Sequence, residues 1–417
     1  MSNRIALLAA AGVAAVSLAV PAALAHTTAP KRAQSSHLLI GINDEGFTLY
    51  GNPAKAFQAI RELKVQVIRV NLYWGGNQWG VANKRPKDAT DPGDSSYDWA
   101  IYDRLARYAW SNHVQLMFSI VGTPPWANNG KGRTAPPTNY DDLSTFAATA
   151  ATRYNGFFIP PASQQDPTLA GPTAPLPVVN LWTAWNEPNN PQFLTPQYKK
   201  AGSKWVVESA ISYAKICDAI YQGIHTVTID PGALTNTTGK YKPTKEIVAC
   251  GVTDPRGNDA PSLLKRASVD PLTFLTAAHA AGMGPFDVYA HNPYASAGTE
   301  SPTYVPKGNG ARRVQFGNLS ALFSLLTKYY GQKHLWITEY GYQTNPPDKT
   351  VFGTSYANQA AWLTQSVKLA RANPRIDIYI WYLIKDEPVL GGWQSGLETA
   401  KGVKKPSWTA FVKLPKG

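Results

Sequence analysis

The segment Val178-Val179-Asn180-Leu181-Trp182-Thr183-Ala184-Trp185-Asn186-Glu187-Pro188 joins an apolar run to a carboxylate. The run has the length and the β-branched and aromatic content of a buried strand. A second segment, Leu335-Trp336-Ile337-Thr338-Glu339, repeats the pattern. The sequence therefore predicts two buried strands that each end in a glutamate, Glu187 and Glu339, in aromatic surroundings.

Strand-like and helix-like segments alternate along the chain, which is typical of a parallel sheet wrapped by helices. The helix-like segments include 197–224, and four long loops, among them 231–261, are rich in Gly, Pro, Asn and Asp. We expect these loops to follow strands, where they would surround a site. The strand candidates are Leu38–Asn43, Val65–Leu72, Val114–Val121, Val178–Trp185, His225–Ile229, Phe286–His291, Leu335–Glu339 and Ile376–Tyr382. Eight strands predict a single α/β domain, a (β/α)8 TIM barrel.

The N-terminus reads as a secretory signal peptide. Arg4 supplies a positive charge, 5–20 is apolar, and Ala23-Leu24-Ala25 fits a cleavage site. A membrane anchor is the alternative, but the apolar stretch is short for a bilayer span. We expect a secreted protein, extracellular or associated with the cell envelope, divided into a signal peptide (1–25), an N-terminal segment (26–37) and a catalytic barrel (38–417).

The chain carries a net charge of +13, with basic residues spread along its length. No compact basic tract or nucleic-acid motif accompanies this charge, so we expect a solvated basic surface that is attracted to acidic polymers. Cys217 and Cys250 are the two cysteines. In an exported protein they favour one disulfide, and two buried free thiols are the alternative.

Two glutamates at strand ends suit one chemistry in particular. Retaining glycoside hydrolysis needs a protonated carboxyl for the leaving oxygen and an ionised carboxylate roughly 5 Å away that attacks the anomeric carbon. Their environments must differ so that their pKa values separate. Glu187 and Glu339 end the fourth and seventh predicted strands and would face one another across the mouth of a barrel.

At these motifs the chain resembles glycoside hydrolase clan A, the retaining (β/α)8-barrel enzymes, and most closely those of the family 5 and family 39 type. Asn186-Glu187 and Trp336-Ile337-Thr338-Glu339-Tyr340 match the ends of the fourth and seventh strands in that clan. The resemblance extends over about 40–411 and implies that Glu187 is the acid/base and Glu339 the nucleophile. A surface carboxylate is the alternative for each.

Further residues gain roles from the same resemblance. Arg69 lies inside an apolar strand, and a buried guanidinium needs a carboxylate partner. The resemblance implies that this partner is the nucleophile, and a structural ion pair elsewhere is the alternative. It also implies that Asn186 binds the sugar 2-hydroxyl and that His291 and Tyr294 hydrogen-bond the catalytic carboxylates. A hydrogen-bonded core histidine is the alternative for His291.

Aromatic side chains are candidates for stacking on the substrate. Trp381, at the end of the eighth strand, resembles the clan's sugar-stacking platform. Trp126 and Trp74 are further candidates, with core or loop packing as the alternative. Residues just beyond strand ends that could select the substrate are Asp44, Glu45, Asp386 and Trp393.

Two features depart from the families named. Gly122-Thr123-Pro124 stands where family 5 enzymes often carry a histidine, and the chain has no room for the β-sandwich common in family 39. The main hypothesis remains a monomeric, secreted retaining β-glycosidase that acts on a polysaccharide or oligosaccharide, without metal or cofactor. The alternatives are a non-catalytic carbohydrate-binding barrel and a Schiff-base lyase or aldolase. The latter is disfavoured because the sixth strand has no lysine.

Overall fold

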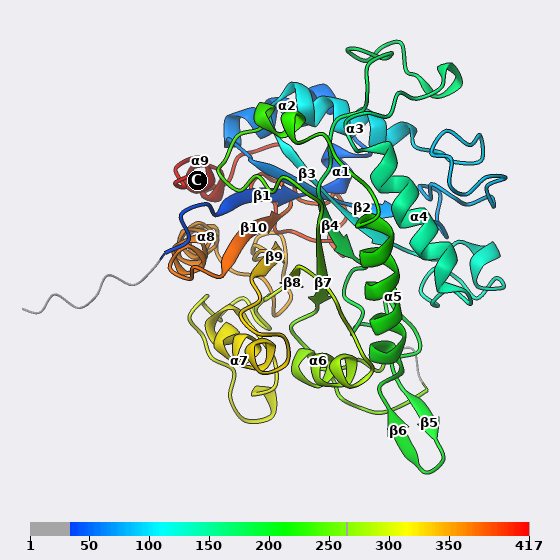
Figure 1. Cartoon of the computed structure of the whole chain (residues 1–417). Helices are drawn as coiled ribbons and strands as arrows, with labels where there is room; N and C mark the ends of the chain where they lie inside the picture. The colour runs from blue at the N-terminus through cyan, green and yellow to red at the C-terminus, as the bar shows by residue number, and fades with distance from the viewer. Residues whose placement is uncertain (1–33, 264–265, 417) are drawn as a thin grey trace, which may run out of the picture. The chain divides into compact units, whose positions relative to one another are not determined.

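The computed structural model describes residues 34–263 and 266–416. Within them, eight parallel strands close into a barrel in the order β1-β10-β9-β8-β7-β4-β3-β2 (Figure 1). The predicted signal peptide lies outside the described residues. The strands are β1 (Leu39–Asn43), β2 (Val67–Tyr73), β3 (Gln115–Val121), β4 (Leu181–Ala184), β7 (Ile247–Thr253), β8 (Val288–His291), β9 (Leu335–Tyr340) and β10 (Ile376–Tyr382). The predicted (β/α)8 barrel is confirmed.

Alternate side chains of the strands fill the bore, as the two-residue period of a strand requires. Trp336 of β9 is the largest of them, and its whole side chain is buried among aliphatic neighbours. The interior cluster consists of Leu39, Val67, Met117, Leu181, Ala249, Val252, Val288, Ala290, Trp336, Ile378 and Ile380. The barrel is therefore a packed core, and free space for a ligand lies beyond the strand ends.

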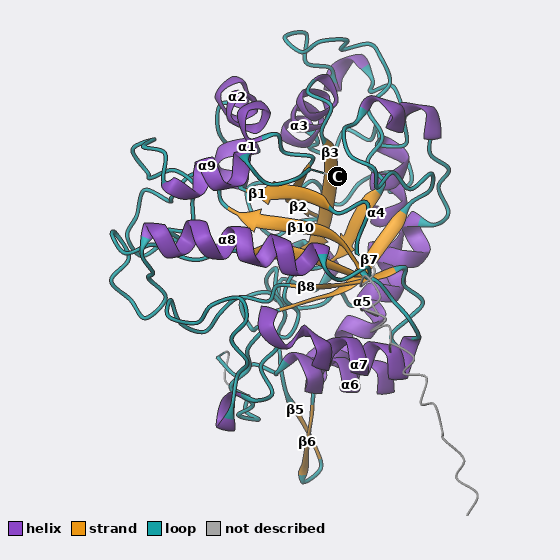
Figure 2. Cartoon of the chain, turned by 90° about the vertical axis from the view of Figure 1, so that its left-hand side faces the viewer, coloured by secondary structure: helices purple, strands orange, loops and turns teal. Residues whose placement is uncertain are grey.

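A layer of helices surrounds the strands (Figure 2). In the described ranges no helix is both long and apolar enough to cross a membrane. The α-helices are α1 (Glu45–Thr48), α2 (Pro53–Leu63), α3 (Ala100–Ser111), α4 (Tyr140–Arg153), α5 (Glu208–Ile224), α6 (Pro271–Ala280), α7 (Leu319–Tyr330), α8 (Tyr356–Arg371) and α9 (Pro406–Val412).

The local sequence explains where these helices begin and end. At α2, the Asn52 side chain accepts a hydrogen bond from the Lys55 backbone N–H, and Pro53 occupies the first helical position. Both features favour a helix start because they satisfy or remove backbone donors that lack a partner there. The helix ends at Leu63 and is capped by Lys64, which has a left-handed backbone with φ of 54°.

The prediction for the fifth strand is wrong. His225 and Thr226 form a turn directly after α5, and the irregular segment that follows packs Ile229 into the core. The fifth barrel strand is β7, which lies inside the segment predicted as the loop 231–261. The segment was predicted as a loop because Gly, Pro, Asn and Asp lie on both sides of β7, whose β-branched run is short.

The helix predicted over 197–224 also needs correction. Its first part is a two-stranded antiparallel hairpin, β5 (Lys199–Ala201) and β6 (Lys204–Val206), and α5 begins only at Glu208. The hairpin extends away from the barrel in both views (Figures 1 and 2). Gly202 supplies the positive φ of its turn, 63°, which a residue with a Cβ adopts at a cost.

The predicted disulfide is present. Cys217 of α5 is bonded to Cys250 of β7, with their Cα atoms 5.9 Å apart. Both residues are fully buried between the helix layer and the barrel. The disulfide therefore fixes α5 against β7, the next barrel strand along the chain.

Candidate active site

The turn after β4 holds Glu187 in an unusual backbone conformation. Trp185 and Glu187 have positive φ angles of 67° and 40°. The Glu187 backbone N–H donates to the Val252 carbonyl at 2.8 Å. Val252, also at positive φ, lies at a break in the β7–β8 register between Gly251 and Thr253. Such bulges redirect a strand locally, and here the bulge turns a carbonyl toward the Glu187 turn.

The Glu187 carboxyl is buried and held by two amides. Asn292 donates to Oε1 at 3.0 Å, and Asn190 donates to Oε2 at 3.2 Å. Burial raises the pKa of Glu187 well above its usual range, and the negative charges of Asp254 and Glu339 raise it further. Because both effects disfavour the anion, Glu187 is suited to hold a proton at neutral pH.

Glu339 has the opposite surroundings. Nη1 of Arg69 donates to its Oε1 at 2.5 Å, and the Tyr294 hydroxyl donates to its Oε2 at 3.2 Å. Arg69 is fully buried, and Nη2 donates to Asn186 Oδ1 at 2.8 Å. The structure thus places Arg69, Asn186 and Tyr294 around Glu339, and the partner of Arg69 is Glu339 as the resemblance implied.

Both glutamates line one cavity of about 660 Å³. Further carboxyl groups from Asp44, Glu45 and Glu387 share it, and so does Asp254. Asn292 connects the two sides, since its side-chain oxygen accepts a hydrogen bond at 2.7 Å from Thr338, the neighbour of Glu339. The two glutamates therefore face a common, acid-rich space in which one is carboxylic acid-like and the other is paired with a cation.

The prediction for His291 is wrong. Its Nδ1 is hydrogen-bonded to the Thr253 hydroxyl and its Nε2 to the Val314 carbonyl, both at 2.8 Å. Both ring nitrogens are therefore occupied, and neither contacts a glutamate. The ring is fully buried, and burial lowers the pKa of His291 to about 4. Asn292, one residue later, makes the contact with the acid that was expected of His291.

The three predicted stacking tryptophans do not line the cavity. Trp381 is fully buried and donates from its indole to the Ser395 carbonyl at 3.1 Å. Trp74 is 1% exposed and packs in the core against Trp126. Trp126 is half-buried and donates to the Ala82 carbonyl at 2.7 Å. For Trp74 and Trp126 the core or loop alternative is correct. Trp381, predicted as the stacking platform, is instead a core residue whose buried ring offers no face to a sugar.

Other aromatic side chains occupy the cavity wall. Trp393, in the loop after β10, lies 5.3 Å from Tyr294 and 5.4 Å from Tyr382, measured between ring centroids. All three line the cavity. Tyr382 follows Trp381 in β10, and successive side chains of a strand point to opposite sides. A one-residue difference along the strand therefore decides which aromatic ring faces the cavity.

Of the four expected selectivity residues, Asp44, Glu45 and Trp393 line the cavity. The Asp44 carboxylate accepts hydrogen bonds from three backbone N–H groups, and burial raises its pKa to about 7. Glu45 accepts from the Asn71 backbone N–H at 2.7 Å, and burial raises its pKa too. Asp386 does not line the cavity, because it forms a buried ion pair with Lys405 at 2.7 Å.

Sequence reasoning missed several polar residues of this site, of which four contact or lie beside Glu187. Asn190 and Asn292 hold the Glu187 carboxyl, and Asp254 and Arg256 follow the end of β7. The position of Asn292, directly after a strand, was a usable signal. Asp254 and Arg256 were hidden because β7 itself was not recognised.

No group of three or more His, Cys, Asp or Glu side chains in the described ranges is arranged to hold a metal ion. The acidic residues of the cavity are instead engaged by backbone amides, side-chain amides, a tyrosine and Arg69.

Comparison with known proteins gives matches in structure alone. No family model matches the sequence, and no curated protein matches it. A family 39 glycoside hydrolase from the gut symbiont Bacteroides cellulosilyticus WH2 aligns with a TM-score of 0.55 and 15% identity over 90% of this chain. A glucosidase from Croceicoccus marinus aligns with a TM-score of 0.58 and 12% identity over 91% of this chain.

The alignments cover 63% of the family 39 protein and 69% of the glucosidase. At these identities they establish a shared fold, the (β/α)8 barrel, for most of this chain. The resemblance drawn from the Asn186-Glu187 and Glu339 motifs is thus matched at the level of the fold by a glycoside hydrolase of family 39.

Proposed function

We propose that the protein is a retaining glycoside hydrolase, with Glu187 as acid/base and Glu339 as nucleophile. The observation that carries the proposal is the unequal environment of two carboxyl groups on one cavity. Burial and neighbouring charge favour the protonated form of Glu187, whereas Glu339 is paired with the Arg69 guanidinium. Retaining glycosidases need this division of roles.

In the first step, Glu339 attacks the anomeric carbon while Glu187 donates its proton to the departing glycosidic oxygen. The bond from the anomeric carbon to the leaving oxygen breaks, and a bond from the anomeric carbon to a Glu339 oxygen forms. Glu339 loses its negative charge when this ester forms, and the leaving group departs as a neutral alcohol.

In the second step, Glu187, now ionised, takes a proton from water as the water attacks the same carbon. The ester to Glu339 breaks, and the sugar is released with its original anomeric configuration. The amides of Asn190 and Asn292 donate to the Glu187 carboxyl. These hydrogen bonds stabilise the Glu187 anion that forms between the two steps.

Asn186 is placed to assist both steps. Its side-chain oxygen accepts from Arg69, which leaves the amide N–H₂ for a ligand in the cavity that Asn186 lines. A hydrogen bond to the sugar 2-hydroxyl would strengthen as positive charge develops on the ring. We extend the proposal to Tyr294, which orients Glu339, and to Trp393 and Tyr382 as the apolar wall for the sugar.

The first prediction tests the nucleophile. Glu339→Gly should lose hydrolysis of an activated aryl β-glycoside and regain turnover when azide is added, with α-glycosyl azide as product. Azide fills the space of the missing carboxylate and attacks once, so the configuration inverts. The product is identified by NMR.

Glu187→Gly serves as the matched variant. It should slow turnover of substrates with poor leaving groups by about 10²–10⁴-fold, and azide should then give the β-glycosyl azide. Full activity of Glu339→Gly, or the same azide anomer from both variants, would refute the assignment. A carbohydrate-binding barrel without activity would show no turnover in any of the proteins.

Secretion and the domain division belong to the same proposal. The disulfide between Cys217 and Cys250 suits an oxidising compartment. We place the catalytic domain at 38–417 and cleavage of the signal after Ala25. Mass spectrometry of the protein from culture supernatant should find an N-terminus near His26, and a cell-bound protein that retains Met1 would contradict this part of the proposal.

A further inference from the structure

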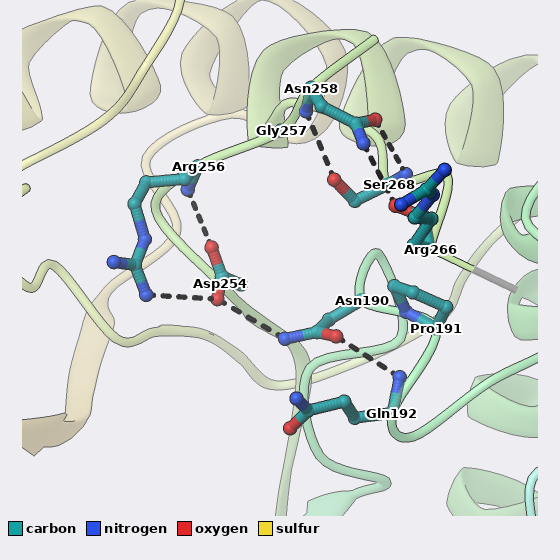
Figure 3. Close-up of a pocket in the computed structure, with 9 residues that line it drawn as sticks. All are labelled: Asn190, Pro191, Gln192, Asp254, Arg256, Gly257, Asn258, Arg266 and Ser268. Carbon is teal, nitrogen blue, oxygen red and sulfur yellow. Dashed lines mark hydrogen bonds and ion pairs between the residues drawn. The ribbon is translucent and has the colours of Figure 1, made fainter. Parts of the chain in front are cut away.

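A second cavity of about 560 Å³ adjoins the catalytic one. The two share part of their walls, because Asn190, Gln192, Asp254 and Arg256 line both. We call the second cavity the side pocket, and Figure 3 shows the nine residues that line it. Since Asn190 also holds the Glu187 carboxyl, the side pocket begins directly beside the proposed proton donor.

The far wall of the side pocket is rigid. The Asn258 backbone N–H donates to the Ser268 hydroxyl at 3.0 Å, and the Ser268 backbone N–H donates to Asn258 Oδ1 at 2.9 Å. Asn258 Nδ2 donates to the Arg266 carbonyl at 2.8 Å. A Cβ at Gly257 would lie 2.2 Å from the Asp270 backbone nitrogen, so only glycine permits this close approach. The pocket is therefore preformed.

The guanidinium of Arg256 keeps its donors available. Asp254 is its charge partner, but their closest nitrogen–oxygen distance is 3.7 Å, which is beyond hydrogen-bond range. Asp254 instead accepts from the Arg256 backbone N–H at 2.7 Å and from Asn190 at 3.3 Å. The Phe352 ring supports the guanidinium from 5.5 Å, and the side chain is 31% exposed. Within the described residues, no hydrogen bond holds this guanidinium.

Arg266 provides a second cation at the side pocket. Its side chain is exposed, and in Figure 3 it lies on the opposite side of the pocket from Arg256. The side pocket thus has two arginines against a single carboxylate, Asp254. The catalytic cavity has the reverse balance, with Arg256 as the one cation among the described residues that line it. An extended ligand would meet an acidic space and then a basic one.

From this arrangement we infer that the side pocket is a subsite for a sugar that carries a carboxylate, a uronic acid residue joined to the sugar at the catalytic glutamates. The inference rests on the proposed function and names its substrate class. An arginine fork binds a carboxylate through two parallel hydrogen bonds, and the exposed side chain of Gln192 offers an amide for a hydroxyl group. The acid-rich catalytic cavity would repel the same carboxylate. The charges therefore direct the uronic acid of the oligosaccharide to the side pocket and its neutral neighbour to the catalytic cavity.

Binding to a hydrolysis-deficient Glu339→Gln protein tests the subsite. The probes are oligosaccharides of glucuronoxylan, polygalacturonate and hyaluronan, each compared with the same oligosaccharide after its carboxyl groups have been reduced to alcohols. Isothermal titration calorimetry should find at least one acidic form bound about tenfold or more tightly than its reduced form, a typical effect of hydrogen bonds to a charged group. The preference should shrink as salt is added.

Arg256→Gln and Arg266→Gln, each made in the same background, should reduce this preference. Arg85→Gln is the matched control, because Arg85 also has a carboxylate partner at 3.9 Å and an aromatic ring at 5.2 Å but lines neither cavity. Circular dichroism and thermal melting establish that the variants are folded. The control should keep the preference of the parent protein.

Equal affinity for acidic and reduced forms, absence of binding to every acidic probe, or an unchanged preference in Arg256→Gln would overturn the subsite. The proposed function fails separately. If the protein with Glu339 intact hydrolyses no glycoside while Glu339→Gln retains its arginine-dependent preference, the subsite stands and the catalytic assignment falls.

Discussion

Asp254 is the neighbouring charge that contributes most to the raised pKa of Glu187. It is hydrogen-bonded to Asn190, which in turn holds the Glu187 carboxyl, and its negative charge contributes to the raised pKa of Glu187. Burial is the larger cause, but burial cannot be changed without altering the cavity. Asp254 therefore offers the cleanest way to test the electrostatic part of the proposal.

Asp254→Asn should move the alkaline limb of the kcat/KM profile to lower pH. Removal of the negative charge makes ionisation of Glu187 easier, so its pKa falls and the protonated acid is lost earlier as pH rises. Asp142→Asn, at a distant surface ion pair, should leave the limb in place. A limb that stays fixed or moves to higher pH in Asp254→Asn would contradict the proposed role of Glu187.

Trp393 and Trp381 should respond differently to the same substitution. Trp393→Ala removes a half-buried ring from the cavity wall and should lower kcat/KM about tenfold, the equivalent of 1–2 kcal/mol of apolar contact. Trp381→Ala removes a fully buried ring and should lower the free energy of unfolding by about 3–5 kcal/mol.

Urea denaturation and aryl glycoside kinetics on the purified variants distinguish the two effects. If Trp393→Ala leaves kcat/KM unchanged while Trp381→Ala reduces it with no loss of stability, the cavity wall has been assigned to the wrong ring.

Residue-level prediction from sequence worked where charge and position restricted the possibilities. Arg69 inside an apolar strand needed a carboxylate, and the structure supplies Glu339. It failed for His291 and Trp381, whose side chains point away from the cavity. A strand's sequence gives two alternating faces, but which face reaches the ligand depends on the register at the strand end.

At the scale of elements, α5 and β7 are joined by the bond between Cys217 and Cys250. The bond spans a sequence separation of 33 residues, so it restricts the unfolded chain considerably. Replacing both cysteines with alanine should lower the free energy of unfolding by about 3–4 kcal/mol. Differential scanning calorimetry should record a lower Tm.

Reducing agent provides the control for this prediction. It should lower the Tm of the parent protein toward that of the double variant and leave the variant itself unchanged. Equal melting of the parent and the double variant under oxidising conditions would show that the bond does not contribute to stability.

The elements that sequence predicted well are those with clear caps or long apolar runs. The errors are concentrated between β4 and β7, where the hairpin β5–β6 interrupts an expected helix and β7 lies in a Gly- and Pro-rich stretch. Local composition there resembles a loop. The hydrogen bonds that make β7 a strand come from β4 and β8, and such long-range pairing is not visible in the local sequence.

At the scale of the whole molecule, buried acids determine how stability depends on pH. Burial raises the pKa of Asp44 to about 7 and the pKa values of Glu187 and Glu246 in the same direction. The folded state therefore holds protons that the unfolded state releases near its ordinary carboxyl pKa. Stability should fall as pH rises through this window. His334 adds to the trend, because its hydrogen bond to Asp377 raises its pKa.

Melting temperatures measured from pH 5 to pH 8 should therefore decrease. Glu246→Gln should flatten the curve, since Glu246 is 2% exposed and only its Oε2 has a hydrogen-bond partner, the Trp182 indole. A melting temperature that rises over this range would show that the buried acids are ionised in the folded protein.

The architecture of the molecule was the most predictable level. Alternating strands and helices, with a carboxylate at the end of two strands, were sufficient to predict the barrel and the ends of β4 and β9 as the site. The predicted barrel does not depend on any one strand's position, because the eightfold repeat tolerates an error such as that at β7.

The left-handed backbone at Glu187 affects the stability of the barrel. A residue with a Cβ adopts this backbone conformation at a cost of roughly 1–3 kcal/mol, and burial of the carboxyl group adds a further free-energy cost. Glycine at this position would remove both costs. A glutamate at this turn therefore lowers the stability of the fold. Such a cost is expected of a carboxyl group that serves the proposed reaction.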